Sequence, residues 1–396
     1  MRGLLVAFAG VLAVLGIHAK AAEPVRIGEI NSYSAIPAFT VPYRNGWKLA
    51  QDEINAAGGV LGGRRIEVLS RDDGGKLAQS LAAAQELTGR DGVTLIVGSY
   101  LSHIGLGLSD FARRNKVVFL AALPMTDDLV WSKGNRYTFR LRASSYMQAA
   151  MLAERAAKLP ATRWATIAPD YEFGRSVVAN FETLLKARRP DVRFVAEQWP
   201  SLGTLDPGRI AAAINAARPD AIFNATFGSD LGRLLHDGQA VFRNRKVVGV
   251  LTGEPEVLDV LGDDAPEGWI VTGYPWYAIP SADHRKFVEA YLAAYEEDPR
   301  LASLVGYIMM KAVAEAIRVA GGTDPEKLIR AFESLSVASP VGIVSFRASD
   351  HQATMGAWVG TTAIRDGAGV MTDWSYGDGN AYLPPPDQTG LRKPQN

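Results

Sequence analysis

Cysteine is missing from the 396 residues of the sequence. Its absence excludes disulfide bonds, thiolate nucleophiles, cysteine-ligated zinc and iron–sulfur clusters. The formal net charge is zero as well, because Lys+Arg and Asp+Glu both number 42. Without a global electrostatic field we expect no nucleic-acid partner. The 47% of hydrophobic residues is ordinary for a globular protein, and at about 100–200 residues per domain the length suggests two or three domains.

Catalytic signatures are also absent. The sequence has no G-x-S-x-G, S-x-x-K, H-E-x-x-H or P-loop motif. The four histidines after residue 21 show no metal-ligand spacing; they are His103, His236, His284 and His351. A secreted hydrolase is the alternative, but it needs a nucleophile–base pair, and these histidines have no evident serine or aspartate partner. We therefore expect a protein that is not an enzyme and uses no cofactor or metal.

A long apolar run occurs only at the start of the chain. Met1-Arg2 precedes the 14-residue apolar run Leu4–Ile17, which is followed by Ala19-Lys20-Ala21. This order is typical of a secretory signal peptide, and the run is shorter than the ~20 residues that a membrane-spanning anchor, the alternative, would need. We predict a signal peptide over residues 1–21. The mature chain, with 40 basic and 42 acidic residues, is then expected free in the periplasm.

Short β-branched runs alternate with longer amphipathic stretches, which is the pattern of parallel sheets with crossover helices. The first unit is expected to contain the strand Val25–Ile30, a loop over Asn31–Tyr43, the helix Arg44–Ala57, the strand Ile66–Leu69, the helix Lys76–Thr88, the strand Val93–Val97, the helix Ser102–Arg114 and the strand Val117–Ala121. A second unit of the same kind runs from the strand Trp164–Ala168 to the strand Val247–Leu251. Residues 367–396 are expected to form a flexible C-terminal tail.

Open α/β sheets bind ligands at the carboxyl ends of their strands, so a cleft between the two units is the expected site. Gly98–His103 lies between a strand and a helix, where serine hydroxyls, amides and the positive helix end would converge on an anion such as a carboxylate. Simple N-capping by Ser99 or Ser102 is the alternative. Phe173, Phe227 and Glu254 follow other strands, where the rings would supply stacking faces and the acid a polar anchor, unless the rings belong to the core.

Four segments in this order carry a resemblance to a known family: Glu53–Val60, Gly98–Ser102, Tyr171–Gly174 and Asp263–Gly268. Their order and spacing resemble type I periplasmic binding proteins, in particular the leucine/isoleucine/valine-binding subgroup that feeds ABC importers. The likeness extends over Val25–Val359. It implies an α/β fold of two doubly wound parallel-sheet lobes joined by three crossover strands, with the ligand trapped by hinge closure.

The resemblance also implies how the chain is divided into lobes and which partners it binds. Lobe I would comprise residues 22–140 and 273–350, and lobe II residues 141–272 and 351–366. The expected partners are a small carboxylate or amino acid ligand and an ABC permease in the inner membrane, with the receptor itself a monomer. The alternative is a ligand sensor that presents its solute to a signalling receptor.

The family's binding positions can be carried over residue by residue. Ser102 takes the place of the serine that binds the ligand carboxylate, and Phe39 aligns with a ligand-facing residue before the first long helix. Leu123 supplies the carbonyl position of the next site loop, where Met125 replaces a threonine. Tyr100 lies in the serine-containing segment and completes this half of the expected site.

On the other half of the site, Phe173 and Phe227 stand at two tyrosine positions of the family, and Glu254 is most similar to the acid that neutralises the ligand ammonium. Compared with the family pattern, this sequence lacks one threonine hydroxyl and two tyrosine hydroxyls at the site. Each buried hydrogen bond that such a hydroxyl makes contributes ~0.5–1.5 kcal/mol. The replacements favour a flat apolar ligand body. We therefore expect an aromatic or hydrophobic carboxylate at least as strongly as a branched-chain amino acid, with His103 assisting Ser102.

Overall fold

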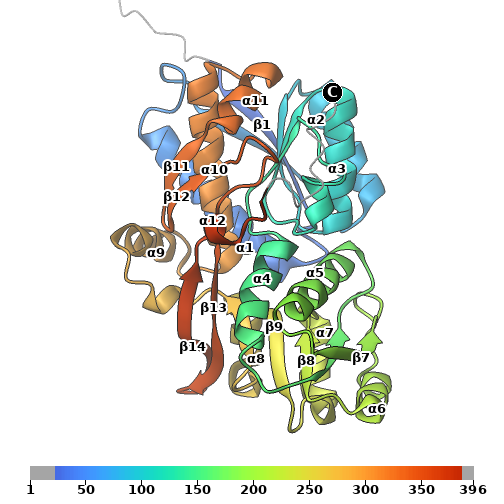
Figure 1. Ribbon diagram of the computed structural model, residues 1–396. Coiled ribbons are helices and arrows are strands. Elements are labelled where there is room, and N and C mark those ends of the chain that lie inside the picture. The colour runs from blue at the N-terminus through green and yellow to red at the C-terminus, as the bar shows by residue number, and fades with distance from the viewer. Residues whose placement is uncertain (1–22, 386–396) are drawn as a thin grey trace, which may run out of the picture.

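The computed structural model describes residues 23–385, which form two α/β lobes, one above the other in Figure 1. The predicted signal peptide, residues 1–21, lies outside the described residues. The upper lobe, lobe I, contains a fully parallel sheet in the order β2-β1-β3-β4-β5. Its strands are β1 (Val25–Asn31), β2 (Ile66–Asp72), β3 (Leu95–Gly98), β4 (Val118–Ala121) and β5 (Thr138–Arg140).

Helices from both halves of the chain cover this sheet (Figure 1). They are α1 (Pro37–Ala56), α2 (Leu77–Gly89), α3 (Ser102–Asn115), the 3-10 turn η1 (Asp127–Leu129), α9 (Ala282–Tyr295), α10 (Leu301–Ala320) and α11 (Pro325–Glu333), together with the hairpin β11 (Ser336–Ser339) and β12 (Gly342–Ser345). Glycines bring α1 and α10 together, because a Cβ on Gly46 would lie 1.9 Å from the carbonyl oxygen of Ser303. This close packing joins the distant segments into one lobe.

The lower lobe, lobe II, contains a seven-stranded sheet in the order β14-β13-β10-β9-β8-β6-β7. Its strands are β6 (Arg163–Ile167), β7 (Arg193–Gln198), β8 (Ala221–Asn224), β9 (Lys246–Gly253), β10 (Ile270–Gly273), β13 (Ala357–Arg365) and β14 (Ala368–Gly377). The five strands from β6 to β10 are parallel and repeat the order of lobe I, whereas β13 and β14 are antiparallel.

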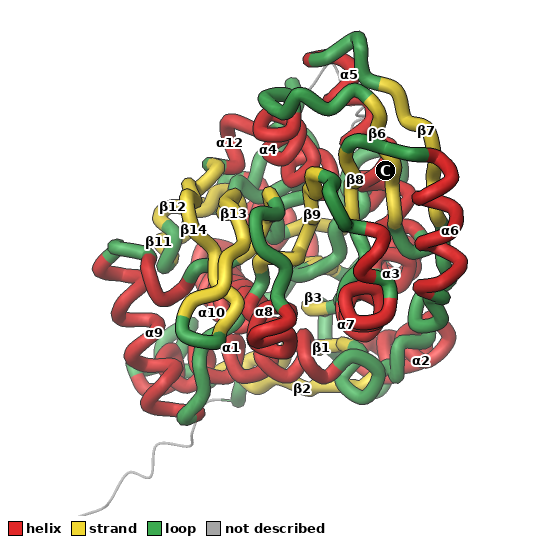
Figure 2. Tube along the Cα trace, turned by 90° about the horizontal axis from the view of Figure 1, so that it is seen from below, coloured by secondary structure: helices red, strands yellow, loops and turns green. Residues whose placement is uncertain are grey.

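Helices lie on both faces of the lobe II sheet. Figure 2 shows α4 and α5 on one side of the strands β6–β9 and α7 and α8 on the other. The helical elements are α4 (Ser145–Ala156), α5 (Glu172–Arg188), α6 (Pro207–Ala217), α7 (Gly228–Asp237), η2 (Gln239–Val241), α8 (Pro255–Leu261), η3 (Gly262–Asp264), η4 (Trp276–Ala278) and α12 (Gly379–Tyr382). Among the helices of residues 23–385, none combines the length and the apolar character needed to cross a bilayer.

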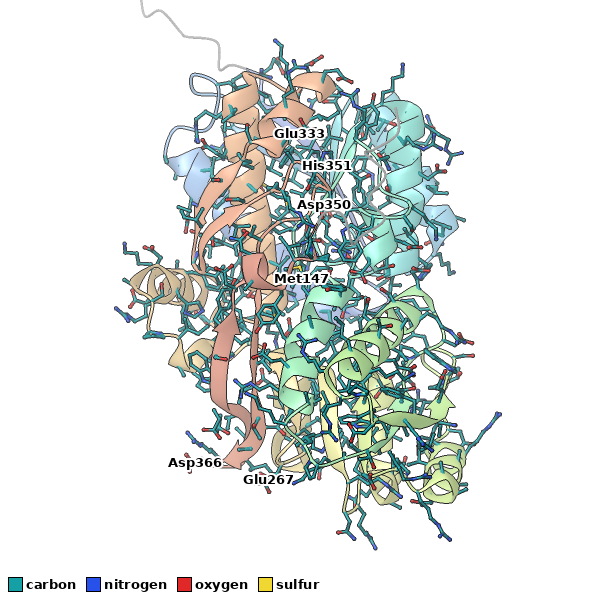
Figure 3. All side chains as sticks on the ribbon, viewed as in Figure 1. Met147, Glu267, Glu333, Asp350, His351 and Asp366 are labelled. Atoms are coloured by element: carbon teal, nitrogen blue, oxygen red, sulfur yellow. The ribbon has the colours of Figure 1, made fainter. Side chains whose placement is uncertain are left out.

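The chain passes between the lobes three times: after β5, after β10 and before β13. Two of these connections run side by side, because Arg140 N donates to the carbonyl of His351 at 3.0 Å and Ala353 N donates to the carbonyl of Arg140 at 2.8 Å. Figure 3 places Asp350 and His351 inside the upper lobe and Met147 at the junction. The predicted fold class, two doubly wound lobes with three crossovers, is confirmed.

Two expectations from the sequence are wrong. Helix α1 begins at Pro37 and contains Pro42, although the range up to Tyr43 was expected to be a loop. Proline at the first helical position has its φ preset and loses no hydrogen bond there, so it starts this helix.

The predicted tail contains a strand, because β14 pairs with β13 throughout Ala368–Gly377. Asp366 and Gly367 connect the two strands with φ of 51° and 78°, the left-handed values that a two-residue hairpin turn requires. An Asp-Gly pair flanked by β-forming residues is the local signal for this hairpin, and the flexible-tail interpretation overlooked it. Figure 3 shows Asp366 and Glu267 at the lower tip of lobe II.

Candidate ligand-binding site

A small cavity lies between the lobes. Lobe I, the first crossover and lobe II all contribute to its wall, which consists of Tyr100, Ser102, Leu123, Met125, Arg142, Tyr171, Phe173, Phe227 and Leu251. Each of these residues lies at or just after the carboxyl end of a parallel strand: β3, β4, β5, β6, β8 or β9. The cavity therefore forms where the carboxyl edges of the two sheets meet, as the doubly wound topology predicts.

Ser102 is the first residue of α3 and is buried. Its Oγ accepts hydrogen bonds from the backbone N–H groups of Met125 and Thr126, both at 3.3 Å. A hydroxyl whose lone pairs are occupied keeps its own proton to donate. Ser102 therefore offers a donor to whatever occupies the cavity.

The alternative of simple N-capping does not apply at this helix. Leu101 occupies the N-cap of α3, and no side chain of the described residues makes a capping hydrogen bond there. The first backbone N–H groups of α3 therefore remain available on the side where Ser102 faces the cavity. An uncapped helix start of this kind attracts negative charge.

Aromatic rings form the opposite wall, with Phe227 at their centre. Its ring centroid lies 6.0 Å from Phe173, 6.0 Å from Phe39 and 6.4 Å from Tyr100. Phe39 is buried behind these rings, 5.2 Å from Tyr100, and does not line the cavity itself. The rings of both lobes thus pack against one another across the interface in the edge-on and tilted geometries that aromatic pairs prefer.

The backbone is strained at two places beside the cavity. Ser99 and Leu251 are non-glycine residues with left-handed φ values of 63° and 69°. Such a conformation costs on the order of 1–2 kcal/mol and is concentrated at functional sites. Both residues lie where a strand turns toward the cavity, and Leu251 lines it.

The lobes also touch through polar groups at the rim. Thr126 Oγ1 donates to Glu172 Oε1 at 2.6 Å, and Asp127 Oδ2 accepts from Ser176 Oγ at 3.0 Å and from Asn180 Nδ2 at 2.5 Å. Thr126 and Asp127 belong to lobe I, whereas the other three residues belong to α5 of lobe II. This arrangement encloses the cavity, and burial raises the pKa of Asp127 while Arg140 opposes the shift.

Besides Phe39, two further predicted site residues, His103 and Glu254, lie outside the cavity wall. His103 is half-buried, with its ring edge-on to Tyr171 at 5.9 Å, and burial lowers its pKa. Glu254 is the N-cap of α8 and forms a buried ion pair with Arg142. Its carboxylate is therefore paired with a residue of the protein and not with a ligand. Burial is the main cause that raises the pKa of Glu254, while Arg142 opposes the shift and Glu256 adds to it.

Three wall residues were not predicted: Arg142, Tyr171 and Leu251. Tyr171 is part of the segment Tyr171–Gly174 and follows a strand end, so its signal was present in the sequence. Arg142 follows β5, a strand of only three residues that has no recognisable pattern. The remaining predicted residues, Tyr100, Ser102, Leu123, Met125, Phe173 and Phe227, are brought together in one cavity.

Within residues 23–385 no group of three or more histidine, cysteine, aspartate or glutamate side chains is placed to hold a metal ion. The polar chemistry of the cavity wall thus comes from hydroxyls, helix amides and one guanidinium. Apart from these groups the wall consists of aromatic, aliphatic and thioether side chains. This combination suits an apolar molecule with an anionic end.

Comparison with known proteins identifies the family of this chain. The family described as periplasmic binding protein matches residues 24–368. Leu/Ile/Val-binding protein homolog 8 of Brucella abortus (strain 2308) is 25% identical over 354 residues, which cover 85% of this chain and 86% of that protein.

Solved structures share the fold. A solute binding protein of an ABC transporter from Rhodopseudomonas palustris BisB5, in complex with 3,4-dihydroxybenzoic acid, has a TM-score of 0.79 at 22% identity, covering 94% of this chain and 99% of that one. A leucine binding protein from Thermotoga maritima MSB8 has a TM-score of 0.77 at 20% identity, covering 88% and 98%.

The family match spans nearly all of the described residues, and both lobes have the doubly wound parallel strands that the resemblance implies. Membership also implies a periplasmic location and a role in binding rather than catalysis. The chain therefore belongs to the periplasmic binding protein family, and it is similar to Leu/Ile/Val-binding members of that family.

Proposed function

We propose that this protein is the solute receptor of an ABC importer and captures one small carboxylate with an aromatic or branched apolar body. The observation that carries the proposal is the cavity between the lobes, which has the Ser102 hydroxyl and the uncapped start of α3 on one side and the rings of Phe173 and Phe227 on the other. A polar donor end and an apolar wall together match an amphipathic acid.

In this proposal the ligand carboxylate lies at the start of α3. The Ser102 hydroxyl donates to it, and the free helix amides complete its coordination, with charge-assisted hydrogen bonds worth ~1.5–3 kcal/mol each. The carbonyl of Leu123 faces a polar group of the ligand. The apolar body packs against Met125 and the rings of lobe II, because sulfur–aromatic and ring–ring contacts favour a flat ligand.

Binding is coupled to closure of the two lobes about the three crossovers. The rim contacts Thr126–Glu172 and Asp127–Asn180 join residues of opposite lobes, so they form only when the cavity is closed. The closed surfaces of both lobes would then dock on a permease in the inner membrane. We propose that the receptor acts as a monomer, secreted by the signal peptide of residues 1–21.

The names of relatives point to two ligand classes, since one solved structure contains 3,4-dihydroxybenzoic acid and another is called a leucine binding protein. The residues of this chain favour the aromatic class. Phe173 and Phe227 offer no hydroxyl to hydrogen-bond an amino acid, and Met125 offers a thioether to the body of the ligand.

The test is isothermal titration calorimetry of the mature chain, from Ala22 onward, at pH 7. Benzoate, 4-hydroxybenzoate and 3,4-dihydroxybenzoate are compared with leucine, isoleucine and valine. We expect at least one carboxylate to bind and to raise the thermal midpoint, because a ligand of the folded state stabilises it. If no acid and no amino acid of the panel binds, the proposed function is wrong.

A further inference from the structure

We propose that Arg142, with Glu254 as its counterion, is the charged group that the cavity presents to its ligand. The site then selects an acid without an ammonium group over the amino acid with the same side chain. This inference rests on the proposed function, because it assigns the charge of the molecule captured in the same cavity. It replaces the ammonium-neutralising acid that the resemblance implies, Glu254, by a positive group, Arg142.

Arg142 is placed rigidly at the cavity wall. Its backbone carbonyl accepts a hydrogen bond from Gln352 Nε2 at 3.0 Å, which fixes it to the neighbouring crossover. Its side chain is only 5% exposed, and one terminal nitrogen is paired with Oε1 of Glu254. Nε of Arg142 is buried and has no hydrogen-bond partner among the described atoms. A buried guanidinium with a free donor beside a cavity requires an acceptor.

A second unpaired group lies in the same wall. The hydroxyl of Tyr100 is buried and likewise has no partner within the part of the chain that the structure describes. Both Arg142 and Glu254 act electrostatically on this hydroxyl, which places it in their neighbourhood. The two donors, Arg142 Nε–H and Tyr100 O–H, are both satisfied by an oxygen atom of a ligand. An ammonium group carries only donors and cannot pair with the guanidinium.

The carboxylate of Glu254 is not available to an ammonium group. It is 3% exposed, does not line the cavity and already has the guanidinium of Arg142 as its partner. The nearby acid Glu256 is also occupied, because its carboxylate accepts the backbone N–H groups of Leu301 at 3.3 Å and Ala302 at 2.8 Å. An ammonium entering the cavity would meet a positive guanidinium first, and the interaction of like charges in a dry site is repulsive.

The experiment compares ligands that differ only by the ammonium group. Calorimetry at pH 7 measures the wild-type mature protein with 3-phenylpropanoate against phenylalanine, and with 4-methylpentanoate against leucine. We expect the acid of a pair to bind at least about 10-fold more tightly than its amino acid, a difference of ~1.4 kcal/mol. Equal affinities, or tighter binding of the amino acid, overturn the assignment. This comparison needs no variant and does not depend on how a variant folds.

Variants then separate the two charged residues. Arg142→Gln is expected to weaken the acid by about 10- to 100-fold and to reduce the preference for the acid, because Glu254 loses its counterion. Arg142→Lys should recover part of the affinity. Glu254→Gln is expected to retain the preference for the acid over the amino acid, since the positive group remains. Arg155→Gln, on the surface of α4, is the matched control, and ligand-free thermal unfolding verifies that each variant is folded.

The outcomes separate the two proposals. If leucine or phenylalanine binds more tightly than its acid and Glu254→Gln abolishes that binding, Glu254 is the ammonium acceptor and only the charge assignment fails. If Arg142→Gln is folded and binds the acid as the wild type does, Arg142 is not a ligand-binding residue. If no member of either pair, and no member of the benzoate panel, binds to the wild type, the proposed function itself fails.

Discussion

The two lobes share one strand order but contribute opposite chemistry to the cavity. In lobe I the sheet runs β2-β1-β3-β4-β5, and in lobe II the parallel strands run β7-β6-β8-β9-β10. The turn after β3 carries Ser102, a hydrogen-bond donor, whereas the corresponding turn after β8 carries Phe227, a ring. The helix that follows the first strand carries a buried phenylalanine near its start in both lobes, Phe39 of α1 and Phe173 of α5.

This difference teaches that the strand-to-helix turns determine the ligand chemistry while the sheets determine where the turns meet. Turn residues can change without altering the strand pairing that positions them. Two similar scaffolds facing each other therefore produce an asymmetric cavity with a polar end and an aromatic end.

Among the described residues, three helices begin at the cavity without a side-chain cap. Helices α3, α5 and α7 begin at the cavity with Leu101, Tyr171 and Phe227, and no side-chain capping bond is present at these positions of the described chain. Helices α6 and α11, away from it, are capped by Asp206 and Asp324. A cap stabilises a helix by ~1 kcal/mol, so the uncapped starts leave their amides to the cavity at a cost in stability.

The largest loss of affinity is expected from Phe227→Ala, which removes the central ring of the lobe II wall. Its contacts with Phe39, Tyr100 and Phe173 are all lost. We expect a penalty of ~2–3 kcal/mol, roughly 30- to 160-fold in Kd, measured by calorimetry with the tightest ligand of the panel.

Phe242→Ala is the control for this variant, because Phe242 packs against Trp269 in the same lobe and does not line the cavity. It is expected to lower the thermal midpoint without changing Kd. If the two variants weakened binding equally, the aromatic wall would have no specific role.

Ser102→Ala tests the polar side of the comparison. It is expected to weaken carboxylates by ~1–3 kcal/mol, because the ligand loses a donor and the amides of Met125 and Thr126 lose their acceptor. Ser109→Ala, equally buried on the same helix but bonded to Thr138 at 2.8 Å, should leave the affinity unchanged. Unaltered carboxylate binding by folded Ser102→Ala would remove this serine from the site.

Thr126→Val tests whether the lobes hold each other closed. It removes the 2.6 Å hydrogen bond to Glu172 of the opposite lobe. In the proposed closure this bond forms only when the lobes meet, so ligand affinity should fall by about 0.5–1.5 kcal/mol, roughly 2- to 13-fold in Kd. A double-mutant cycle with Glu172→Gln measures the coupling; additive effects of the two substitutions would contradict it.

The smallest effect on affinity is expected from replacing Glu29, a buried residue of strand β1 in lobe I. The corresponding strand of lobe II, β6, contains no acidic residue. Burial raises the pKa of Glu29 from 4.5 to about 8, although Ser70 Oγ donates to it at 2.6 Å. The folded state thus binds the proton more tightly than the unfolded state, and the free energy of unfolding falls as pH rises between about 4.5 and 8.

Glu29→Gln should flatten this decline and leave Kd unchanged. Urea unfolding at several pH values, with wild type and variant side by side, isolates the contribution of this one carboxyl group because all other titrating groups are common to both. A parallel pH dependence in the two proteins would contradict the assignment.

Much of the site could be predicted because its residues follow strand ends. Ser102, Phe173 and Phe227 lie at local patterns of strand, turn and helix, and parallel topology brings such turns to one edge. Glu254 was predicted at the right turn, but its partner could not be predicted. Arg142 and Glu254 lie 112 positions apart in the chain, and no local pattern announces that they will pair.

The same reasoning explains the errors in the fold. The start of α1 was misplaced because its two prolines were interpreted as loop residues, and β14 was missed because the chain was expected to end in a tail. Both elements depend on what they pack against: α1 on α10 and β14 on β13. Local signals for both elements were present in the sequence, a proline at the first helical position and an Asp-Gly pair, and these tertiary contacts add to them.

By itself the sequence determined the alternation of strands and helices, the two lobes and the residues at the strand ends, because hydrophobic periodicity and turn residues act over a few neighbouring positions. Only the tertiary structure decided which of those residues share a cavity, and that the carboxylate of Glu254 is already paired with Arg142. Burial and charge pairing depend on distances between segments far apart in the chain, and these distances exist only once the lobes have packed.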